Sequence, residues 1–417
     1  MAGSDKRDGI SMDRLIALAA RALSAGDVLT ALKLVALRTD PPALALRGIV
    51  MARLGDLPRA RALLRDAARA FGTDDAVALA RCRLALAEIA LVARDPGRPV
   101  QALGAVRATL AAHGDHANAA HAGYLQARYR LLTGHLDAAG QALDAVDVAA
   151  LPPASLAGYR LVEAGIAMRR IRAAPARAAL ILAAEAARAA GIPALIAEVD
   201  RAKQLFDAPA ACAVGSRGQQ WLRLDAVEAL LASDALIVDT GRHLVRAGTI
   251  RLSLAGRPVL LALARALAEG WPGAVPRETL IARAFGGREA DETHRARLRV
   301  EIGRLRALIR PLARLRATTR GFVLMPSAAG TVTVLVPPVD GAHGDVLALL
   351  SDGEAWSTSA LAGALGVSPR TVQRALEVLA RLGKVERCGR GRACRWMAPT
   401  VPGFPTSLLL PAEGPNG

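Results

Sequence analysis

The chain has 417 residues, with 54 Lys and Arg against 37 Asp and Glu, so its formal net charge is +17 at pH 7. Hydrophobic residues make up 53% of the chain and charged residues 22%, which excludes a disordered chain of low hydrophobicity. The length predicts several domains, each with its own core. Only four of the basic residues are lysine, so 50 are arginine. Arginine binds phosphate or carboxylate through paired N–H donors, so the excess positive charge is consistent with an acidic partner. The alternative is a compositional bias toward arginine.

Neither membrane insertion nor secretion is predicted. The one uncharged run of spanning length, residues 322–339, contains Pro326, Pro337 and Pro338 and alternates Thr and Val like a strand. The N-terminal residues MAGSDKRDGI lack the apolar segment of a secretory signal, so we expect the protein in the cytoplasm. In that reducing compartment, the cysteines are expected to be free thiols without CxxC spacing: Cys82, Cys212, Cys388 and Cys394.

Residues 1–232 are predicted to be all-helical, because Leu and Ala recur at steps of three and four residues between breaks at Gly, Pro and Asp. One unit recurs around turn positions 55, 95, 134 and 173, which are 40, 39 and 39 residues apart, and a turn at Gly26-Asp27 fits a capping hairpin. Helical hairpins at this period predict an α-solenoid, because each hairpin buries its apolar face only against its neighbours. The stretch LGDLPRARALL around Gly55 resembles tetratricopeptide-type repeats. The alternative is an irregular helical bundle.

Residues 235–338 follow a different pattern and predict an α+β domain. The stretch LIVDTGRHLVRAGTIRLSL alternates like short strands, whereas RPVLLALARALAEG and PRETLIARAFG are typical of helices. A longer arginine-rich helix is expected from about Thr293 to Ile309, and RATTRGFVLM predicts a closing β-hairpin. Strands, three helices and a hairpin are the order of a winged helix with an extra N-terminal sheet.

These stretches resemble the DNA-binding domain of the OmpR/PhoB-type response regulators. VPRETLIARAFG corresponds to the second helix of that family, RLRVEIGRLRALI to the recognition helix and TTRGFVLM to the wing. The resemblance implies that the recognition helix enters the major groove of double-stranded DNA. The receiver domain of that family is replaced by helical repeats, so control by phosphorylation of that type is not implied.

Residues 342–398 predict a second winged helix-turn-helix. They have the spacing of a small residue, a turn glycine and an apolar anchor: Ala362, Gly366 and Val372. Ser368 is a natural N-cap and Pro369 fits the first helical position, which fixes where the second helix begins. KVERCGRGRACRWM supplies a wing, and the module resembles the winged helices of MarR- and DeoR-like regulators. Residues 399–417 are rich in Pro and Gly and are predicted to be disordered.

The positive charge is concentrated in these two modules. Residues 251–325 hold 15 Arg against six acidic residues, a net charge of +9, and residues 342–398 hold eight basic against five acidic residues, a net charge of +3. Residues 1–250 carry +7 over more than three times the length of the first of these segments. A basic patch on a helix-turn-helix is the electrostatic footprint of phosphate binding.

The arginine-rich helix divides into faces. Its apolar stripe must point to the domain core: Leu298, Ile302, Leu305 and Ile309. We expect base-edge contacts from Arg297, Val300 and Arg304. We expect mainly phosphate contacts from Arg295, Arg299 and Arg306, with Arg320 in the wing. The alternative is a solvated basic face, or arginines whose stems cover apolar surface.

The second module offers further DNA-binding candidates on the outer face of its second helix: Ser368, Arg370, Thr371, Gln373 and Arg374. Its wing tip can lay Arg390 and Arg392 along the backbone or into a minor groove. The alternative for this tip is an ordinary flexible hairpin loop. A redox clamp between Cys388 and Cys394, which bracket it, is a further alternative.

Catalytic motifs are not recognised in the sequence: GxxxxGK[ST], GxGxxG after a strand, HExxH and GxSxG are all missing. Three histidines fit metal spacing only loosely: His113, His116 and His121. We interpret them as polar surface residues. The sequence therefore predicts no enzyme, no cofactor and no metal site.

The expected fold is mainly α, an N-terminal α-solenoid followed by two winged-helix (α+β) domains. We predict a transcriptional regulator whose winged helices bind duplex DNA and whose repeats sense a protein partner or self-associate. The combination resembles the antibiotic regulatory protein family, in which the DNA-binding domain comes first. The alternative is a non-enzymatic interaction scaffold whose winged helices bind protein within a larger nucleic-acid or defence assembly.

Overall fold

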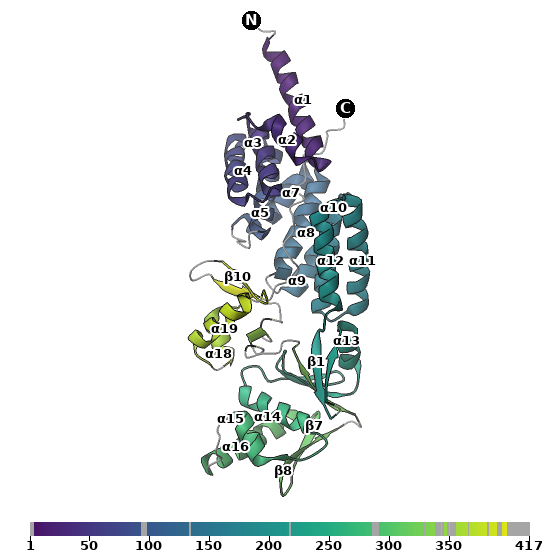
Figure 1. The fold of residues 1–417 in the computed structure, drawn as a ribbon, viewed down its shortest axis with the longest axis vertical. Helices are drawn as coiled ribbons and strands as arrows, with labels where there is room; N and C mark the ends of the chain where they lie inside the picture. Colours follow the sequence, from purple (N-terminus) through teal and green to yellow (C-terminus); the bar gives the residue numbers. More distant parts are fainter. Residues whose placement is uncertain are drawn as a thin grey trace.

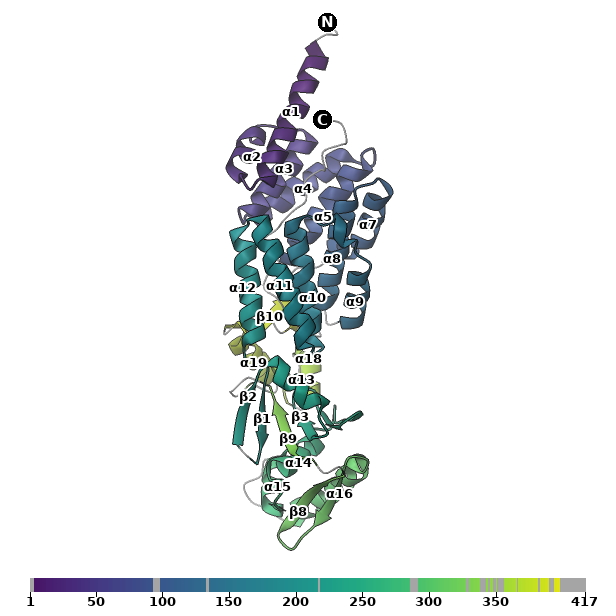
Figure 2. The same cartoon turned by 90° about the vertical axis from the view of Figure 1, so that its right-hand side faces the viewer.

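The chain forms an elongated molecule with stacked helices at one end and strands with further helices at the other (Figures 1 and 2). The computed structural model describes residues 4–92, 98–132, 135–216, 218–285, 292–327, 330–337, 343, 346–347, 350, 356–365, 367–381, 383–389 and 394–397. None of the helices within these ranges combines the length and the apolar character needed to cross a bilayer.

The N-terminal half consists of stacked helix pairs (Figure 1). The pairs are α1 (Ser4–Ser24) with α2 (Val28–Val35), α3 (Pro41–Arg53) with α4 (Leu57–Phe71), α5 (Ala76–Val92) with α6 (Arg98–Gln101) and α7 (Leu103–Ala112), α8 (His116–Leu132) with α9 (Leu136–Asp144), and α10 (Pro153–Arg169) with α11 (Ala173–Ala190). A 3-10 turn, η1 (Val148–Ala150), precedes α10, and α12 (Pro193–Asp207) ends the series. The predicted succession of helical hairpins is confirmed at this level.

In each of the first two helix pairs, the turn between the helices is a glycine followed by an aspartate. Gly26 and Gly55 have φ angles of 84° and 87°, a left-handed backbone that favours glycine. The next residues, Asp27 and Asp56, each accept a hydrogen bond from the backbone N–H three residues later, at 3.0 and 3.1 Å. One glycine therefore ends a helix and one aspartate begins the next, as the turns at these positions predict.

A six-stranded sheet follows the helices, with strand order β2-β1-β9-β3-β4-β5. Its strands are β1 (Ala211–Gly215), β2 (Gly218–Leu222), β3 (Leu236–Asp239), β4 (Leu244–Ala247), β5 (Ile250–Ser253) and β9 (Val332–Val336), and α13 (Leu224–Ala232) lies between β2 and β3 in the chain. Strand β9 pairs parallel with β3 and antiparallel with β1, so it joins the two halves of the sheet.

The prediction that residues 1–232 are all-helical is wrong for β1 and β2. This hairpin pairs Ala211 with Leu222 and extends the sheet beyond β9. Two strands of five residues are too short for periodicity to separate them from helix, and their partner β9 lies far along the chain. The strand predicted from the Thr/Val alternation is confirmed as β9.

Three helices and a second sheet pack with the six-stranded sheet. They are α14 (Pro258–Glu269), β6 (Val275–Pro276), α15 (Arg277–Phe285), α16 (Glu292–Ile309), β7 (Ala313–Ala317) and β8 (Gly321–Pro326), and the second sheet has the order β6-β8-β7. Leu267 of α14, Leu305 of α16 and Val334 of β9 are fully buried in one shared core. The order of strands, three helices and closing hairpin is the one that the sequence predicts.

The last described elements form a unit with its own core: α18 (Thr358–Leu365), α19 (Pro369–Arg381), β10 (Glu386–Cys388) and β11 (Arg395–Met397). Val372 and Leu376 of α19 pack in that core with Trp396. The hydroxyl of Ser368 accepts a hydrogen bond from the N–H of Thr371 at 3.1 Å, which confirms the predicted N-cap. Of the residues singled out in the predicted module, three lie outside the described residues, and so does the predicted tail: Gly366, Arg390, Arg392 and 399–417.

Candidate nucleic-acid interface

Helix α16 lies at the end of the molecule away from α1, next to the β7–β8 hairpin (Figures 1 and 2). All four residues of its predicted stripe are buried: Leu298, Ile302, Leu305 and Ile309. The opposite face carries small exposed residues: Ala296, Val300, Gly303 and Ala307. Val300 is 54% exposed, and a Cβ added at Gly303 would meet no atom within 4 Å. The helix therefore presents a narrow, open outer face to solvent.

The five predicted arginines of α16 are all exposed and flank this outer face: Arg295, Arg297, Arg299, Arg304 and Arg306. Glu292 forms ion pairs with Arg299 and Arg295 at 3.1 and 3.5 Å, and Glu301 pairs with Arg304 at 2.8 Å. Ion pairs between exposed side chains contribute about 0–1 kcal/mol, because water screens them. The guanidinium groups of Arg295 and Arg299, whose ion pairs with Glu292 are exposed on both sides, can therefore exchange a carboxylate for a phosphate at little cost.

Two of the arginines are held by neighbouring elements. The guanidinium carbon of Arg297 lies 4.6 Å from the centre of the Phe285 ring at the end of α15, a cation–π contact that orients the side chain. Arg306 donates its Nε to the carbonyl oxygen of Leu315 in β7 at 3.1 Å, which ties α16 to the hairpin. Arg306 thus has a role inside the domain in addition to the predicted phosphate contact.

Strand β8 of the β7–β8 hairpin approaches strand β6 closely at Gly321. A Cβ at Gly321 would lie 1.9 Å from the carbonyl oxygen of Val275 in β6, so only glycine fits there. Arg277 donates to the carbonyl oxygens of Thr318 and Thr319, both at 3.0 Å, and holds the turn. This places exposed Arg320 at the tip of the hairpin.

Sequence reasoning missed three exposed arginines beside the predicted set: Arg310 after α16, and Arg314 and Arg316 in β7. Arg314 pairs across the hairpin with Met325, so this face of the hairpin is basic and partly apolar. The alternation Arg-Leu-Arg at 314–316 is the signal that could have found them, since it directs both arginines to one face of a strand.

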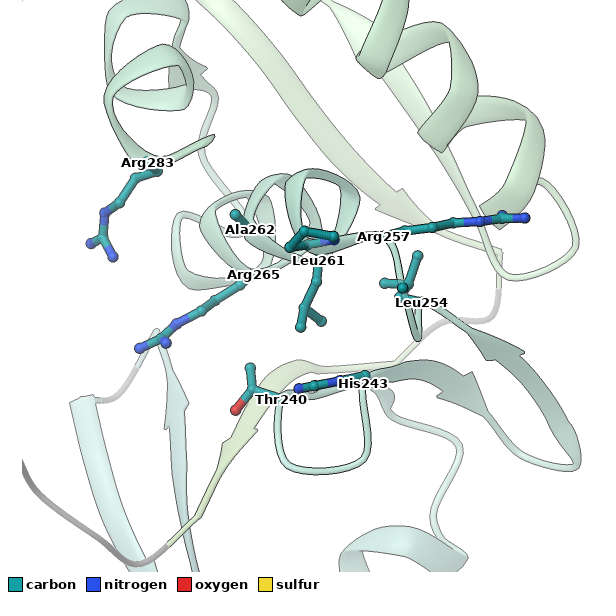
Figure 3. A pocket seen from close by; sticks show the side chains of 10 residues that line it. Thr240, His243, Leu254, Arg257, Leu261, Ala262, Arg265 and Arg283 are labelled. Atoms are coloured by element: carbon teal, nitrogen blue, oxygen red, sulfur yellow. The ribbon is translucent and has the colours of Figure 1, made fainter. Parts of the chain in front are cut away.

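A cavity of about 240 Å³ separates α14 from the β3–β4 turn (Figure 3). Its lining includes Thr240, His243, Leu254, Arg257, Leu261, Ala262, Arg265 and Arg283. Arg265 and Arg283 both pair with Glu269, at 2.7 and 3.3 Å, so their charges are partly compensated.

The side chain of Arg257 points in a different direction from those of the other arginines of this cavity. In Figure 3 it extends away from Arg265 and Arg283. It also lines a wider hollow of about 720 Å³ that includes Arg304 of α16. The basic surface of α16 therefore continues to the start of α14, where backbone N–H groups also favour anions.

The second module places four of its predicted residues on the exposed surface of α19: Arg370, Thr371, Gln373 and Arg374. Two of them also make local contacts: the Thr371 hydroxyl lies 2.9 Å from that of Ser368, and Gln373 donates to Glu377 at 3.0 Å. Cys394 accepts a hydrogen bond from Arg387 at 3.1 Å. The side chain of Cys388 lies outside the described part, so the redox clamp stays a prediction.

The interpretation of His121 as a surface residue is wrong. Its side chain is fully buried between α5, α8 and α10, where Nε2 lies 3.2 Å from Glu88 and Nδ1 lies 3.0 Å from the Ser155 hydroxyl. His113 and His116 are exposed, as predicted. Sequence reasoning missed the acidic partner because three different hairpins supply the three residues.

This buried network has the residue types of a hydrolytic triad, but a substrate has no access to its serine. Ser155 has no exposed surface, so a substrate carbonyl cannot reach its hydroxyl in this structure. Glu198 of α12 is also fully buried, and burial raises the pKa of its carboxyl to about 7 while Arg128 opposes the rise. The contacts of His121 with Glu88 and Ser155 link three helices of the repeats, α5, α8 and α10, through polar side chains.

Comparison of the chain with protein-family models, with curated proteins and with solved structures gives no match. The resemblance to regulators therefore rests on the sequence motifs and on the order of the elements. Among the described residues, no group of three or more His, Cys, Asp and Glu side chains is arranged to hold a metal ion.

Proposed function

We propose that the protein is a DNA-binding transcriptional regulator that reads duplex DNA through α16. The observation that carries the proposal is the division of this helix: a buried apolar stripe, a small open outer face, and exposed arginines along both sides. A helix of this kind fits the width of the major groove, where arginine binds guanine edges and phosphates.

The surrounding elements support the interpretation of this region as a winged helix. A leading sheet, three helices and the β7–β8 hairpin follow one another in that order. Exposed Arg314, Arg316 and Arg320 then make the hairpin a basic wing beside the recognition helix. In the second module, α18 and α19 with the β10–β11 hairpin form a second, smaller reader of DNA.

The helical repeats have the role of a cytoplasmic sensor or assembly domain in this proposal. Stacked helix pairs present extended surfaces to a protein partner or a second copy of the chain. In this proposal the buried Ser155, His121 and Glu88 contribute to packing and not to catalysis, and the regulator acts without enzymatic activity, cofactor or metal.

Selection of duplexes from a random pool tests the proposal. The full chain should enrich a defined sequence, and Arg297→Ala with Arg304→Ala should lose that preference, at about 1 to 3 kcal/mol for each base contact. Arg188→Ala, at an exposed position of α11, is the matched control. Absence of any enriched sequence would overturn the regulator and favour a scaffold whose winged helices bind protein.

A further inference from the structure

A cavity of about 210 Å³ lies within the helical repeats, between α1, α3, α4 and α5. Its walls are mainly apolar and include Leu46, Leu64 and Phe71. The space exists because alanines face it where larger side chains would fill it: Ala45, Ala78 and Ala85. Protein interiors normally pack without voids of this size, and an apolar cavity with a few polar groups is the usual form of a small-molecule site.

Two charged residues line this cavity, Asp75 and Arg81, and only the arginine has an ion-pair partner among the described residues. Asp75 is exposed at the start of α5; its Oδ1 accepts the N–H of Ala78 at 2.8 Å, while its Oδ2 accepts no hydrogen bond from the described residues. Arg81 donates its Nε to the buried carboxylate of Asp115 at 2.7 Å, so its charge is already compensated. Burial raises the pKa of the Cys82 thiol to about 12, so this side chain stays neutral.

We propose that this cavity binds a small organic amine, with its apolar body against Leu46, Leu64 and Phe71 and its ammonium group at Asp75. Burial of the apolar body supplies affinity, since each methylene group removed from water adds to binding. A charge-assisted hydrogen bond from the ammonium to Oδ2 selects cations over anions. The inference goes beyond DNA binding and does not depend on it.

Binding of two probes to the full chain tests the proposal: 2-phenylethylamine as the amine and 3-phenylpropionate as its anionic counterpart. Isothermal titration should give saturable binding of the amine, and thermal unfolding should shift to higher temperature with amine concentration. Because Asp75 is exposed, we expect the anion to bind about fivefold more weakly, and added salt to reduce the difference.

Two variants separate the cavity from the charge. Ala78→Leu fills the cavity and should abolish amine binding, whereas Ala111→Leu, at an exposed position of α7, should bind as the wild type does. Asp75→Asn keeps an oxygen that can cap α5 and should remove the preference for amine over anion. Helix content measured by circular dichroism verifies that each variant is folded.

Three results would overturn the proposal. They are failure of the wild-type chain to bind the amine, unchanged binding by folded Ala78→Leu, and equal affinity of the wild type for both probes. None of them involves DNA, so failure here leaves the proposed regulator standing, and failure of DNA binding leaves this site standing.

Discussion

Substitution of Gly303 by leucine should separate folding of α16 from its binding to DNA. A Cβ at this position meets no atom within 4 Å, so a leucine side chain extends into solvent without strain. Glycine inside a helix is about 0.8–1.0 kcal/mol less favourable than alanine, and leucine is close to alanine. Gly303→Leu should therefore stabilise the folded protein by about 0.5–1 kcal/mol, measured from the denaturant midpoint.

The same substitution should weaken binding to the selected duplex, because the leucine occupies the face that we place in the groove. Forcing extra side-chain volume into a packed contact costs about 1–3 kcal/mol, which corresponds to a loss of roughly 5- to 150-fold in affinity by fluorescence anisotropy. Gly104→Leu is the matched control, since Gly104 is an exposed helical glycine of α7 with only Gln126 near its Cβ, at 3.9 Å. If a stabilised Gly303→Leu binds DNA as tightly as wild type, the outer face of α16 does not enter the groove.

Three further predictions concern the packing. Gly321→Ala brings a Cβ onto the carbonyl oxygen of Val275 and should destabilise the protein by about 2 kcal/mol or more in chemical unfolding; an unchanged midpoint would refute the close approach. Ser155→Ala leaves buried His121 without its hydroxyl partner and should cost about 1–3 kcal/mol while DNA affinity stays constant. The pKa of Glu198 is about 7 in the folded protein, against 4.5 for the ordinary carboxyl. Between about pH 4.5 and 7 the folded state therefore keeps a proton that the unfolded chain has lost. The free energy of unfolding falls as pH rises through that window. Glu198→Gln should remove this fall and be more stable by up to about 3 kcal/mol above pH 7, and an unaltered pH profile would contradict it.

Local chemistry explains which parts of the fold were predictable. The Gly-Asp turns, the Ser368 cap and the apolar stripe of α16 depend on residues a few positions apart, so the sequence alone predicts them. The β1–β2 hairpin was not predictable in this way, because its place in the sheet depends on pairing with the distant strand β9.

The candidate site also has features that the sequence predicts and features that depend on tertiary packing. The exposed arginines of α16 follow from helical periodicity, but the Phe285 ring under Arg297 and the contact of Arg306 with Leu315 arise from tertiary packing. Burial of His121 has the same origin, since its partners come from α5 and α10.

The most direct test of DNA binding by α16 is the affinity for the selected duplex across a salt series. Counterion release predicts a linear fall of log affinity against log salt, with a slope of about −0.9 for each phosphate contact. Arg295→Ala and Arg299→Ala should each reduce the magnitude of that slope by about 1. Affinity that does not depend on salt, or a slope unchanged in both variants, would contradict the account.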